Sequence, residues 1–505
     1  MKQFFFKTAA AIAALILTAG ILSPAVYGLR VYDATAQDYP EFSAAVRQHR
    51  TEQTEDTLIV GTDGTLPDFR AFHPLQTVQG PDDTYTVTFS SANEAADMLP
   101  QICAMPGVEY AEPNVCVVAQ GDIDIQAASY RTYGMELMKA EQFADGLRGR
   151  NDLQKVVVAV VDSGIKADLS VFDGRLVEGA TMNGSSQTED AYGHGTCVAS
   201  IVADCTKELP VKIMPVRVLR ADGTGTLLDS ANGIRYAADH GAAIINISFV
   251  TPNTCSRTLH NAVDYALWQG ALPVICAGNE SADLDKTDCC PADYGAGVVV
   301  TGCDQNGRLY RNSCYGSTVD LCAPAVNVKC VMTSGRTAEL DGTSFAAPHI
   351  SAIAAMYKLY MPGAGHAALE RMLRLNTKDF GDGGYDRRYG WGIPDLSALD
   401  GAKKWNTNRT VVRNVKLQSP PDKTTYAYKE AFNPAGFQIK VTYADGYVET
   451  RSTQGVQFMD AKTDKQGTHT VRAVLDGHEV KFDITVQFRW WQWLIQIFLF
   501  GWLWY

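Results

Sequence analysis

The most informative segment of this sequence is Leu340-Asp-Gly-Thr-Ser-Phe-Ala-Ala-Pro-His-Ile-Ser-Ala-Ile-Ala-Ala-Met-Tyr-Lys-Leu-Tyr360. Gly342 and Thr343 predict a tight turn, after which Ser344 begins a long apolar helix. The helix dipole and the backbone N–H of Ser344 favour negative charge beside its hydroxyl. Pro348 has no N–H to donate to the Ser344 carbonyl, so we expect an irregular first turn. Read alone, Ser344 also fits an ordinary helix N-cap, so other motifs must decide its role.

Length and composition indicate a soluble protein of several domains. The chain has 505 residues, of which 46% are hydrophobic and 20% are charged, as is ordinary for globular proteins. Its net charge of −12 argues against nucleic acid as a partner.

The twelve cysteines indicate an exported protein. Ten of them lie between Cys197 and Cys330, and the even count predicts some disulfides, although the sequence does not give their pairing. The sequence contains no Cys-x-x-Cys and no Cys/His spacing typical of zinc sites. Cys276 lies in an apolar run, where a buried free thiol is equally consistent.

Residues 1–28 have the pattern of a secretory signal peptide. Lys2 and Lys7 precede an apolar run from Ala9 to Ile21, and Val26-Tyr-Gly28 offers small residues at which a signal peptidase would cut. An uncleaved membrane anchor is the alternative, but the run is short for a membrane span.

Residues 29–125 alternate strand-like and helix-like segments, which predicts a small α+β domain. The expected strands are Thr57–Val60 and Tyr85–Phe89, followed by an amphipathic helix over Ala92–Ala104 and a closing strand from Val108 to Val118.

Two later apolar runs predict buried strands of a parallel sheet, and each leads into a polar side chain. Val156–Val161 leads into Asp162, and Ala271–Gly278 leads into Asn279. Such side chains meet at the C-terminal edge of an open α/β sheet, where ligands bind. Taken singly, both residues also fit ordinary turns, although a neutral amide donor suits an oxyanion site. No G-x-G-x-x-G follows the first strand, which argues against a Rossmann fold.

Gly193-His194-Gly195 places an imidazole at the start of another apolar helix. The flanking glycines let the ring approach other groups closely, and a packed core histidine is the alternative. Further along, the Gly-rich segment Gly223–Gly225 and a strand that ends at Ser248 would flank a cleft. Both segments could pair with an extended peptide by β-augmentation.

Together these motifs resemble those of subtilases, the subtilisin-like serine proteases. Asp162-Ser-Gly, Gly-His194-Gly-Thr, Ala-Gly-Asn279 and Gly-Thr-Ser344-x-Ala-x-Pro-His follow the order of that family, within about residues 133–399. Four separate motifs in one order outweigh the alternatives that each residue allows alone. The resemblance implies an α/β peptidase domain over residues 126–400, in which helices flank a parallel sheet.

The resemblance also implies the role of each residue. Ser344 is the nucleophile, His194 is the general base and acid, and Asp162 orients the imidazole. Asn279 and the Ser344 N–H bind the oxyanion. Such chemistry needs no cofactor and no catalytic metal. A further set matches the strands that hold the substrate backbone: Gly223, Thr224, Gly225, Ser248, Phe249, Val250 and Gly278.

Residues 29–125 resemble the inhibitory propeptide of the same family. The matching run is Pro106-Gly-Val-Glu-Tyr-Ala-Glu-Pro-Asn114. The resemblance implies that this domain occupies the cleft of its own enzyme and is cut off between about Val118 and Thr132, so that the protein is made as a zymogen.

Three features depart from the family pattern. Val250 stands where many relatives have glycine, and we expect it to narrow or reshape the primary specificity pocket. Cys197 and Cys276 lie near catalytic motifs and predict sensitivity to oxidation or mercury. Relatives often bind structural calcium, but no D-x-D-x-D-G loop locates a calcium site here.

Four acidic residues follow Asn279 closely, and by the same resemblance they lie near the rim of the primary pocket. An acidic rim would favour basic residues beside the cleaved bond. Carboxylates on a solvated loop contribute only about 0 to 1 kcal/mol each, so the alternative is that they merely keep the loop hydrated. The four are Glu280, Asp283, Asp285 and Asp288.

The C-terminal part changes composition after a linker at residues 401–409. Residues 410–488 alternate apolar and polar side chains between turn signals, which predicts a small β-sandwich. They resemble bacterial immunoglobulin-like domains in Phe432-Asn-Pro-Ala-Gly436 and Val441-Thr-Tyr-Ala-Asp-Gly446.

Residues 489–505 form an aromatic tail with five of the eight tryptophans and no charge after Arg489. Tryptophan and tyrosine cluster at both of its ends, as in interfacial aromatic belts, and a helix of this length would fall short of the hydrocarbon core. We therefore expect the tail to hold the exported protein at the outer face of the cell membrane. Packing of the tail onto the protein itself is the alternative.

Two functions remain open at the level of sequence. The first is a secreted serine endopeptidase that cleaves proteins or peptides and is inhibited by its own propeptide. The second is a catalytically inactive binding protein of the cell surface that keeps the protease fold. The complete set Asp162, His194, Ser344 and Asn279 favours the endopeptidase.

Overall fold

The computed structural model describes residues 56–488, apart from 65–66, 82, 120–121, 125–131, 404–411, 431 and 454. The predicted signal peptide and the predicted aromatic tail lie outside the described residues. So do most of the predicted linker and most of the segment in which we expect cleavage. No helix among the described residues is long and apolar enough to cross a membrane.

The N-terminal part is a four-stranded antiparallel sheet with one long helix, which agrees with the α+β pattern of its sequence. The strand order is β2-β3-β1-β4, and the apolar residues of the helix pack against the sheet. Ser91 caps the helix by accepting a hydrogen bond from the Glu94 N–H at 3.2 Å. The elements are β1 (Thr57–Thr62), η1 (Phe69–Phe72), β2 (Gln76–Gln79), β3 (Thr84–Thr88), α3 (Ala92–Cys103) and β4 (Val108–Pro113).

The single closing strand expected from Val108 to Val118 is wrong, because the chain changes sheets within it. β4 ends at Pro113 and belongs to the N-terminal sheet, whereas β5 (Cys116–Ala119) pairs with β10 and β12 of the next domain. Proline has no N–H to continue a ladder, so Pro113 is a natural place for the break. The side-chain oxygen of Asn114 then accepts a hydrogen bond from the Leu228 N–H at 3.1 Å.

A seven-stranded sheet forms the centre of the molecule, with the order β16-β15-β13-β11-β7-β9-β8. Every strand pair in this sheet is parallel. Its inner strands are continuous apolar runs because helices cover both faces. The strands are β7 (Val156–Asp162), β8 (Ala180–Thr181), β9 (Val211–Arg217), β11 (Ile244–Ile247), β13 (Leu272–Cys276), β15 (Val298–Cys303) and β16 (Val319–Pro324).

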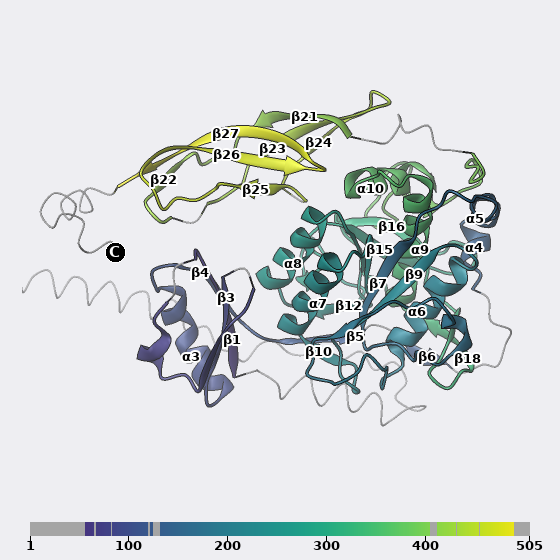
Figure 1. Cartoon of the computed structure of the whole chain (residues 1–505), viewed down its shortest axis with the longest axis horizontal. Coiled ribbons are helices and arrows are strands. Elements are labelled where there is room, and N and C mark those ends of the chain that lie inside the picture. Colours follow the sequence, from purple (N-terminus) through teal and green to yellow (C-terminus); the bar gives the residue numbers. More distant parts are fainter. Residues whose placement is uncertain are drawn as a thin grey trace, which may run out of the picture. The chain divides into compact units, whose positions relative to one another are not determined.

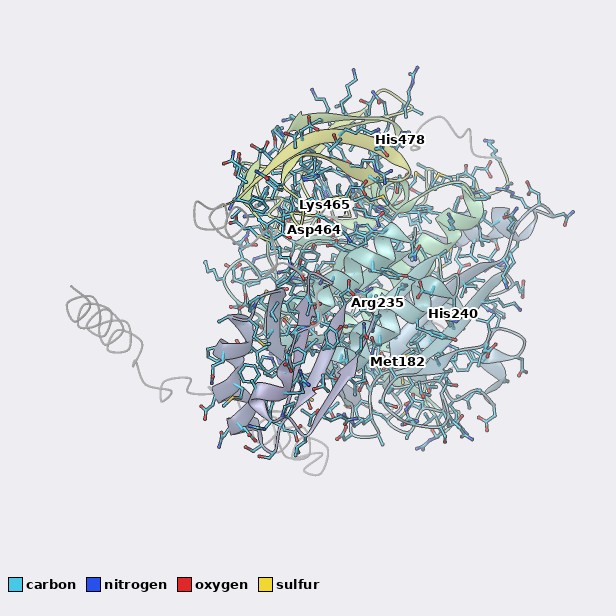
Figure 2. The ribbon with its side chains drawn as sticks, turned by 60° about the vertical axis from the view of Figure 1, so that its left-hand side comes forward. Met182, Arg235, His240, Asp464, Lys465 and His478 are labelled. Carbon is cyan, nitrogen blue, oxygen red and sulfur yellow. The ribbon has the colours of Figure 1, made fainter. Side chains whose placement is uncertain are left out.

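Helices lie on both sides of this sheet, with α7 and α8 on one face and α6 and α9 on the other (Figure 1). The predicted α/β fold with a helix-flanked parallel sheet is therefore confirmed. Figure 2 labels Arg235 and His240 in α7 and at its C-terminal end. The helices of this domain are α4 (Gly134–Leu137), α5 (Glu141–Arg148), η2 (Ser170–Phe172), α6 (His194–Cys205), α7 (Leu227–Asp239), α8 (Arg257–Trp268), α9 (Thr343–Tyr360) and α10 (His366–Leu375).

Short strands complete the domain around the central sheet. β5 lies between β10 and β12, and β12 also pairs with β14. β6 joins β17 and β18 in a three-stranded sheet. Their bounds are β6 (Asp122–Asp124), β10 (Thr224–Thr226), β12 (Phe249–Pro252), β14 (Cys289–Cys290), β17 (Val328–Val331), β18 (Thr337–Asp341), β19 (Thr377–Lys378) and β20 (Ile393–Pro394).

The C-terminal part is the predicted β-sandwich. One sheet has the order β21-β23-β24 and the other β22-β27-β26-β25, and aromatic side chains such as Phe437, Phe458 and Phe482 pack between them. Figure 2 labels Asp464 and Lys465 in the connection before β26, and His478 at the start of β27. The strands are β21 (Val412–Ser419), β22 (Thr425–Ala427), β23 (Gln438–Tyr443), β24 (Val448–Arg451), β25 (Gln457–Met459), β26 (Gly467–Leu475) and β27 (His478–Gln487).

None of the twelve cysteines forms a disulfide in this structure, in contrast to the expectation from their number. Nine of them are buried, where a thiol behaves as a small apolar side chain. An even count of cysteines therefore overstated the evidence for pairing.

Candidate active site

Asp162 and His194 form a buried, directly bonded pair. Asp162 is the last residue of β7, and His194 is the first residue of α6. The imidazole Nδ1 lies 2.9 Å from each carboxylate oxygen of Asp162. Because the carboxylate can only accept, Nδ1 carries the proton and Nε2 is the basic nitrogen of the neutral ring.

Glycine is required beside this pair for a steric reason. A Cβ on Gly195 would lie 2.3 Å from the Gly164 carbonyl oxygen and 3.1 Å from Cβ of Asp162. Gly193, which precedes the helix, has a φ of 107° that other residues rarely adopt. The two glycines thus allow α6 to begin against the end of β7, which brings the imidazole onto the carboxylate.

Ser344 is the second residue of α9 and is fully buried. Its Oγ donates to the Ser248 carbonyl at 2.9 Å rather than to His194. The Phe345 ring lies 5.6 Å from the His194 ring, centroid to centroid. The hydroxyl proton must therefore leave the Ser248 carbonyl before it can pass to Nε2.

Pro348 leaves the Ser344 carbonyl without its helical partner, and Ser248 supplies the missing hydrogen bond. Ser248 Oγ donates to that carbonyl at 2.9 Å. Ser248 Oγ in turn accepts from Asn246 Nδ2 at 2.8 Å, and Asn246 Oδ1 accepts from Ser351 Oγ at 2.9 Å. This buried chain of hydrogen bonds replaces the backbone bond that proline removes.

Sequence reasoning overlooked Asn246 and Ser351 as members of the site. A signal for Asn246 was present, because a fully buried asparagine interrupts the otherwise apolar run Ala243–Ile247. A buried amide needs partners, and this requirement points to neighbouring polar groups. Ser351 gave no such signal, since serine is common in helices.

Asn279 follows β13, and its orientation is fixed by Thr343. The Asn279 Oδ1 accepts from the Thr343 N–H and from the Thr343 hydroxyl, each at 2.9 Å. The same hydroxyl accepts from the Gly278 N–H at 3.1 Å. These bonds use the amide oxygen, which leaves the Nδ2 group as a donor for an oxyanion beside Ser344.

The segments predicted to hold a substrate lie on both sides of β5. β10 pairs with it through Thr224↔Val118 and Gly225↔Val117, and β12 pairs through Phe249↔Ala119 and Val250↔Val118. All of these pairings are antiparallel. Residues 116–119 of the chain thus lie between β10 and β12, where a substrate is predicted to bind. We call this position between the two strands the substrate track. A Cβ on Gly225 would lie 2.8 Å from the Val218 carbonyl oxygen and from Leu219 Cδ2, and 3.1 Å from Val117 Cγ2, so this position has no room for a side chain.

Ion pairs neutralise part of the negative charge of the acidic loop after Asn279. Arg387 contacts both Asp283 and Asp285, and Lys286 lies 3.0 Å from Asp283. Hydrogen bonds from Lys286 and Ser317 lower the pKa values of Asp283 and Asp285, respectively. Glu280 accepts from the Asn279 N–H at 2.8 Å. Ion pairing thus weakens the argument for a basic preference.

Two thiols near the catalytic motifs are buried. Cys276 lies beside the hydroxyls of Thr343 and Ser344, and burial raises its pKa. Contact with Cys330, together with burial, raises the pKa of Cys197. The thiolate is the form that oxidants attack, so burial and raised pKa values weigh against the predicted sensitivity of Cys197 and Cys276 to oxidation.

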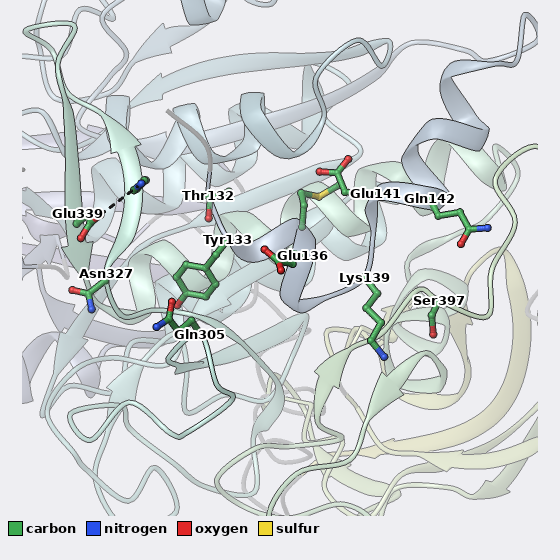
Figure 3. Close-up of a pocket in the computed structure, with 12 residues that line it drawn as sticks. Thr132, Tyr133, Glu136, Lys139, Glu141, Gln142, Gln305, Asn327, Glu339 and Ser397 are labelled. Atoms are coloured by element: carbon green, nitrogen blue, oxygen red, sulfur yellow. Dashed lines mark ion pairs between the residues drawn. The ribbon is translucent and has the colours of Figure 1, made fainter. Parts of the chain in front are cut away.

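A pocket of about 940 Å³ lies at the start of the peptidase domain (Figure 3). Lys329 and Glu339 form an ion pair across part of its wall at 3.9 Å. None of the residues predicted for catalysis or substrate binding lines it. Its lining residues are Thr132, Tyr133, Met135, Glu136, Lys139, Glu141, Gln142, Gln305, Asn327, Lys329, Glu339 and Ser397.

Comparison with known proteins agrees with this geometry. Residues 154–392 match the subtilase family, and residues 419–486 match the bacterial Ig-like domain (group 3). Subtilisin DY of Bacillus licheniformis is 33% identical over 276 residues, which are 53% of this chain and 97% of that protein. The chain belongs to the subtilase family. The recognition of a subtilase with a bacterial Ig-like domain is thereby confirmed.

Two further relatives define how far the likeness extends. The thermophilic serine proteinase of Bacillus sp. strain AK1 is 35% identical over 50% of this chain and 63% of its own length. Fervidolysin from Fervidobacterium pennivorans shares the fold, with a TM-score of 0.61 at 19% identity over 83% of this chain and 70% of its own. The peptidase domain of this subtilase is thus that of a serine endopeptidase.

His349, in the second turn of α9, predicts how stability depends on pH. Its Nδ1 donates to the Phe345 carbonyl at 2.7 Å, and Nε2 accepts from the Thr132 hydroxyl at 2.8 Å. Burial lowers its pKa from 6.5 to about 4. The unfolded chain therefore binds one more proton than the folded chain between these values. We expect unfolding free energy to fall by about 3 kcal/mol as the pH drops through this window.

The measurement is chemical denaturation of the protein at several pH values between 6.5 and about 4. A His349→Gln variant should be less stable at neutral pH but should lose this part of the pH dependence. The exposed His240 is the matched control, and His240→Gln should leave the slope unchanged (Figure 2). An unchanged slope in His349→Gln would contradict the assignment.

Proposed function

We propose that this subtilase is a secreted serine endopeptidase that is made as a zymogen and hydrolyses proteins or peptides through an acyl-enzyme. The observation that carries the proposal is the bond of 2.9 Å between His194 Nδ1 and the buried Asp162 carboxylate. That bond leaves Nε2 as a base at a site where Ser344 begins a helix and Asn279 offers an amide donor.

The proposed reaction has two halves, acylation and deacylation, and the same groups act in both. Ser344 Oγ rotates away from the Ser248 carbonyl, gives its proton to His194 Nε2 and attacks the scissile carbonyl. Asp162 stabilises the imidazolium, while Asn279 Nδ2 and the Ser344 N–H stabilise the oxyanion. His194 then protonates the leaving amine. Water then gives a proton to the same imidazole and attacks the acyl carbon, and His194 returns that proton to Ser344 Oγ as the acyl–Oγ bond breaks. These side chains complete peptide hydrolysis, so we propose no cofactor for the chemistry.

The N-terminal α+β domain is proposed to be the inhibitor of this enzyme. Its last residues pair with both walls of the substrate track, as a bound peptide would. In addition, Glu112 accepts three hydrogen bonds at the start of α8, from Ser256 Oγ at 2.9 Å, the Arg257 N–H at 3.0 Å and the Thr258 N–H at 3.1 Å. A carboxylate at a helix N-terminus is stabilised by the helix dipole.

Export and membrane attachment are also proposals. The relatives include a protein named minor extracellular protease Epr, from Bacillus subtilis strain 168, which is 29% identical over 58% of this chain and 46% of its own length. We propose the same compartment here, with residues 1–28 as the signal and residues 489–505 as the membrane-surface segment. A structural calcium ion remains a prediction without a located site.

Replacement of the proposed nucleophile tests the catalytic mechanism. Ser344→Ala should lower the rate of casein hydrolysis by roughly a million-fold and stop self-processing, because no other group can form the acyl-enzyme. Ser334→Ala, at an exposed serine of a nearby loop, is the control and should retain full activity. Persistent cleavage by Ser344→Ala would disprove the assignment, and an inactive wild type would favour the binding protein.

The register of β5 predicts where the propeptide is cut. Val118 pairs with Val250 and Ala119 with Phe249, so the described pairing of β5 with β12 reaches Ala119. β6 begins at Asp122. We expect cleavage between Ala119 and Asp122, within the broader range expected from the sequence. N-terminal sequencing of the mature protein measures this. An active species that starts near Leu29 would contradict the zymogen.

Truncation after Phe488 tests the aromatic tail. The tail should supply most of the membrane affinity, so the truncated protein should move from the membrane fraction into the medium and remain active. Casein hydrolysis in the two fractions measures both properties at once. Equal partitioning of the truncated and full-length proteins would show that the tail is no anchor.

A further inference from the structure

Three metal-ligating side chains meet at the edge of the peptidase domain, apart from the triad. His260 comes from the first turn of α8, Cys290 from β14 and Asp293 from the turn that follows. Their ligand atoms, a ring nitrogen, a thiol sulfur and a carboxylate oxygen, all lie within 4.8 Å of one another. The mechanism proposed above uses none of them.

Two of these atoms are buried polar groups without a hydrogen-bond partner among the described residues, namely His260 Nε2 and Asp293 Oδ1. They lie 3.6 Å apart, which is too far for a hydrogen bond between them. The Asp293 side chain is only 8% exposed. Leaving such groups without a hydrogen bond is unfavourable, and more so for a charged group. A bound cation would satisfy both.

The remaining contacts hold these side chains in place. Asp293 Oδ2 accepts from the Cys289 N–H at 2.9 Å, so Oδ1 is the oxygen left for the cluster. The His260 ring stacks on Tyr294, with centroids 4.1 Å apart and planes 10° apart. The Tyr294 hydroxyl donates a hydrogen bond to Asp264, and this bond fixes the Tyr294 ring. Cys290 is fully buried.

The mixed donor set selects the kind of ion. Calcium and magnesium prefer oxygen ligands only, whereas imidazole, thiolate and carboxylate together are typical of zinc. One thiolate and one carboxylate would balance the charge of a divalent ion, and the thiol proton would leave to solvent on binding. We propose that His260, Cys290 and Asp293 form a binding site for a zinc-type divalent cation.

The position of the cluster indicates a structural role for the ion. It would join α8 to β14, and β14 pairs with β12 through Thr251↔Cys290. β12 also carries Phe249 and Val250, which form one wall of the substrate track. An ion at this cluster would therefore stiffen the wall against which a substrate pairs.

Cobalt titration of the full-length protein, purified reduced and free of metal, tests the proposal directly. Co²⁺ should produce thiolate-to-cobalt charge-transfer absorption, and Zn²⁺ should abolish it by displacement. Cys290→Ser should lose the absorption. Loss of a residue that only supports a metal ligand weakens metal affinity by roughly 10- to 100-fold. Asp293→Asn and His260→Gln change the ligands themselves, so each should weaken Co²⁺ binding by at least that factor.

Cys289→Ser is the matched control, because Cys289 is the neighbouring residue in β14 but belongs to a different group. Its thiol lies near Glu280 and Cys314, within 4.8 Å of both. This variant should keep the absorption. Loss of the absorption in Cys289→Ser with retention in Cys290→Ser would place the ion at the Glu280 group and overturn the proposal. No absorption in the reduced wild type would also overturn it, as would a disulfide of Cys290 in the exported protein.

Thermal unfolding supplies a second readout that does not depend on the cobalt spectrum. Zn²⁺ should raise the Tm of the wild type and of Cys289→Ser in a concentration-dependent way, because the three ligands are brought together only in the folded state. His260→Gln keeps both thiols and should show no such rise. An equal rise in His260→Gln and wild type would exclude this cluster as the site, even if Cys290→Ser fails to fold.

Discussion

The active site depends on a reciprocal pair of hydrogen bonds between Ser248 and Ser344. Ser248 Oγ donates to the Ser344 carbonyl, and Ser344 Oγ donates to the Ser248 carbonyl, both at 2.9 Å. The first bond is needed because Pro348 cannot donate to that carbonyl. The second holds the hydroxyl at the end of the β11 strand. The helix that carries the nucleophile is thereby joined to the substrate wall, and a change in either element would move the other.

The parallel sheet explains why residues from distant parts of the sequence meet here. The C-terminal ends of parallel strands lie along one edge, so Asp162 after β7 and Asn279 after β13 reach the same crevice. The starts of α6 and α9 lie at that edge as well, which brings His194 and Ser344 to it. The strands and helices that carry or precede these residues are almost wholly buried, and this packing fixes the site.

Sequence reasoning predicted the parts of the structure that single segments determine. The apolar runs before Asp162 and Asn279, and the glycines around His194, gave strands and helices in the right places, and Asp162 and His194 lie in contact. It could not predict the long-range partners. Pro113 alone does not predict that the chain leaves one sheet for another. Likewise, the sequence around Asp283 and Asp285 does not predict their ion pairs with Arg387, which is about a hundred residues away in sequence. Such contacts depend on tertiary packing, and so does the pairing of cysteines.

The pairing of β5 with β10 and β12 also limits how this enzyme can choose its substrates. Backbone hydrogen bonds hold the track on both sides, and such bonds are available to any extended peptide except at proline. Selectivity must therefore come from side chains that face the peptide. Val250 is one of these, since it lies opposite Val118 and is fully buried where a glycine would leave space. Because Arg387 pairs with Asp283 and Asp285, we propose that shape at Val250 determines selectivity more than charge on the acidic loop.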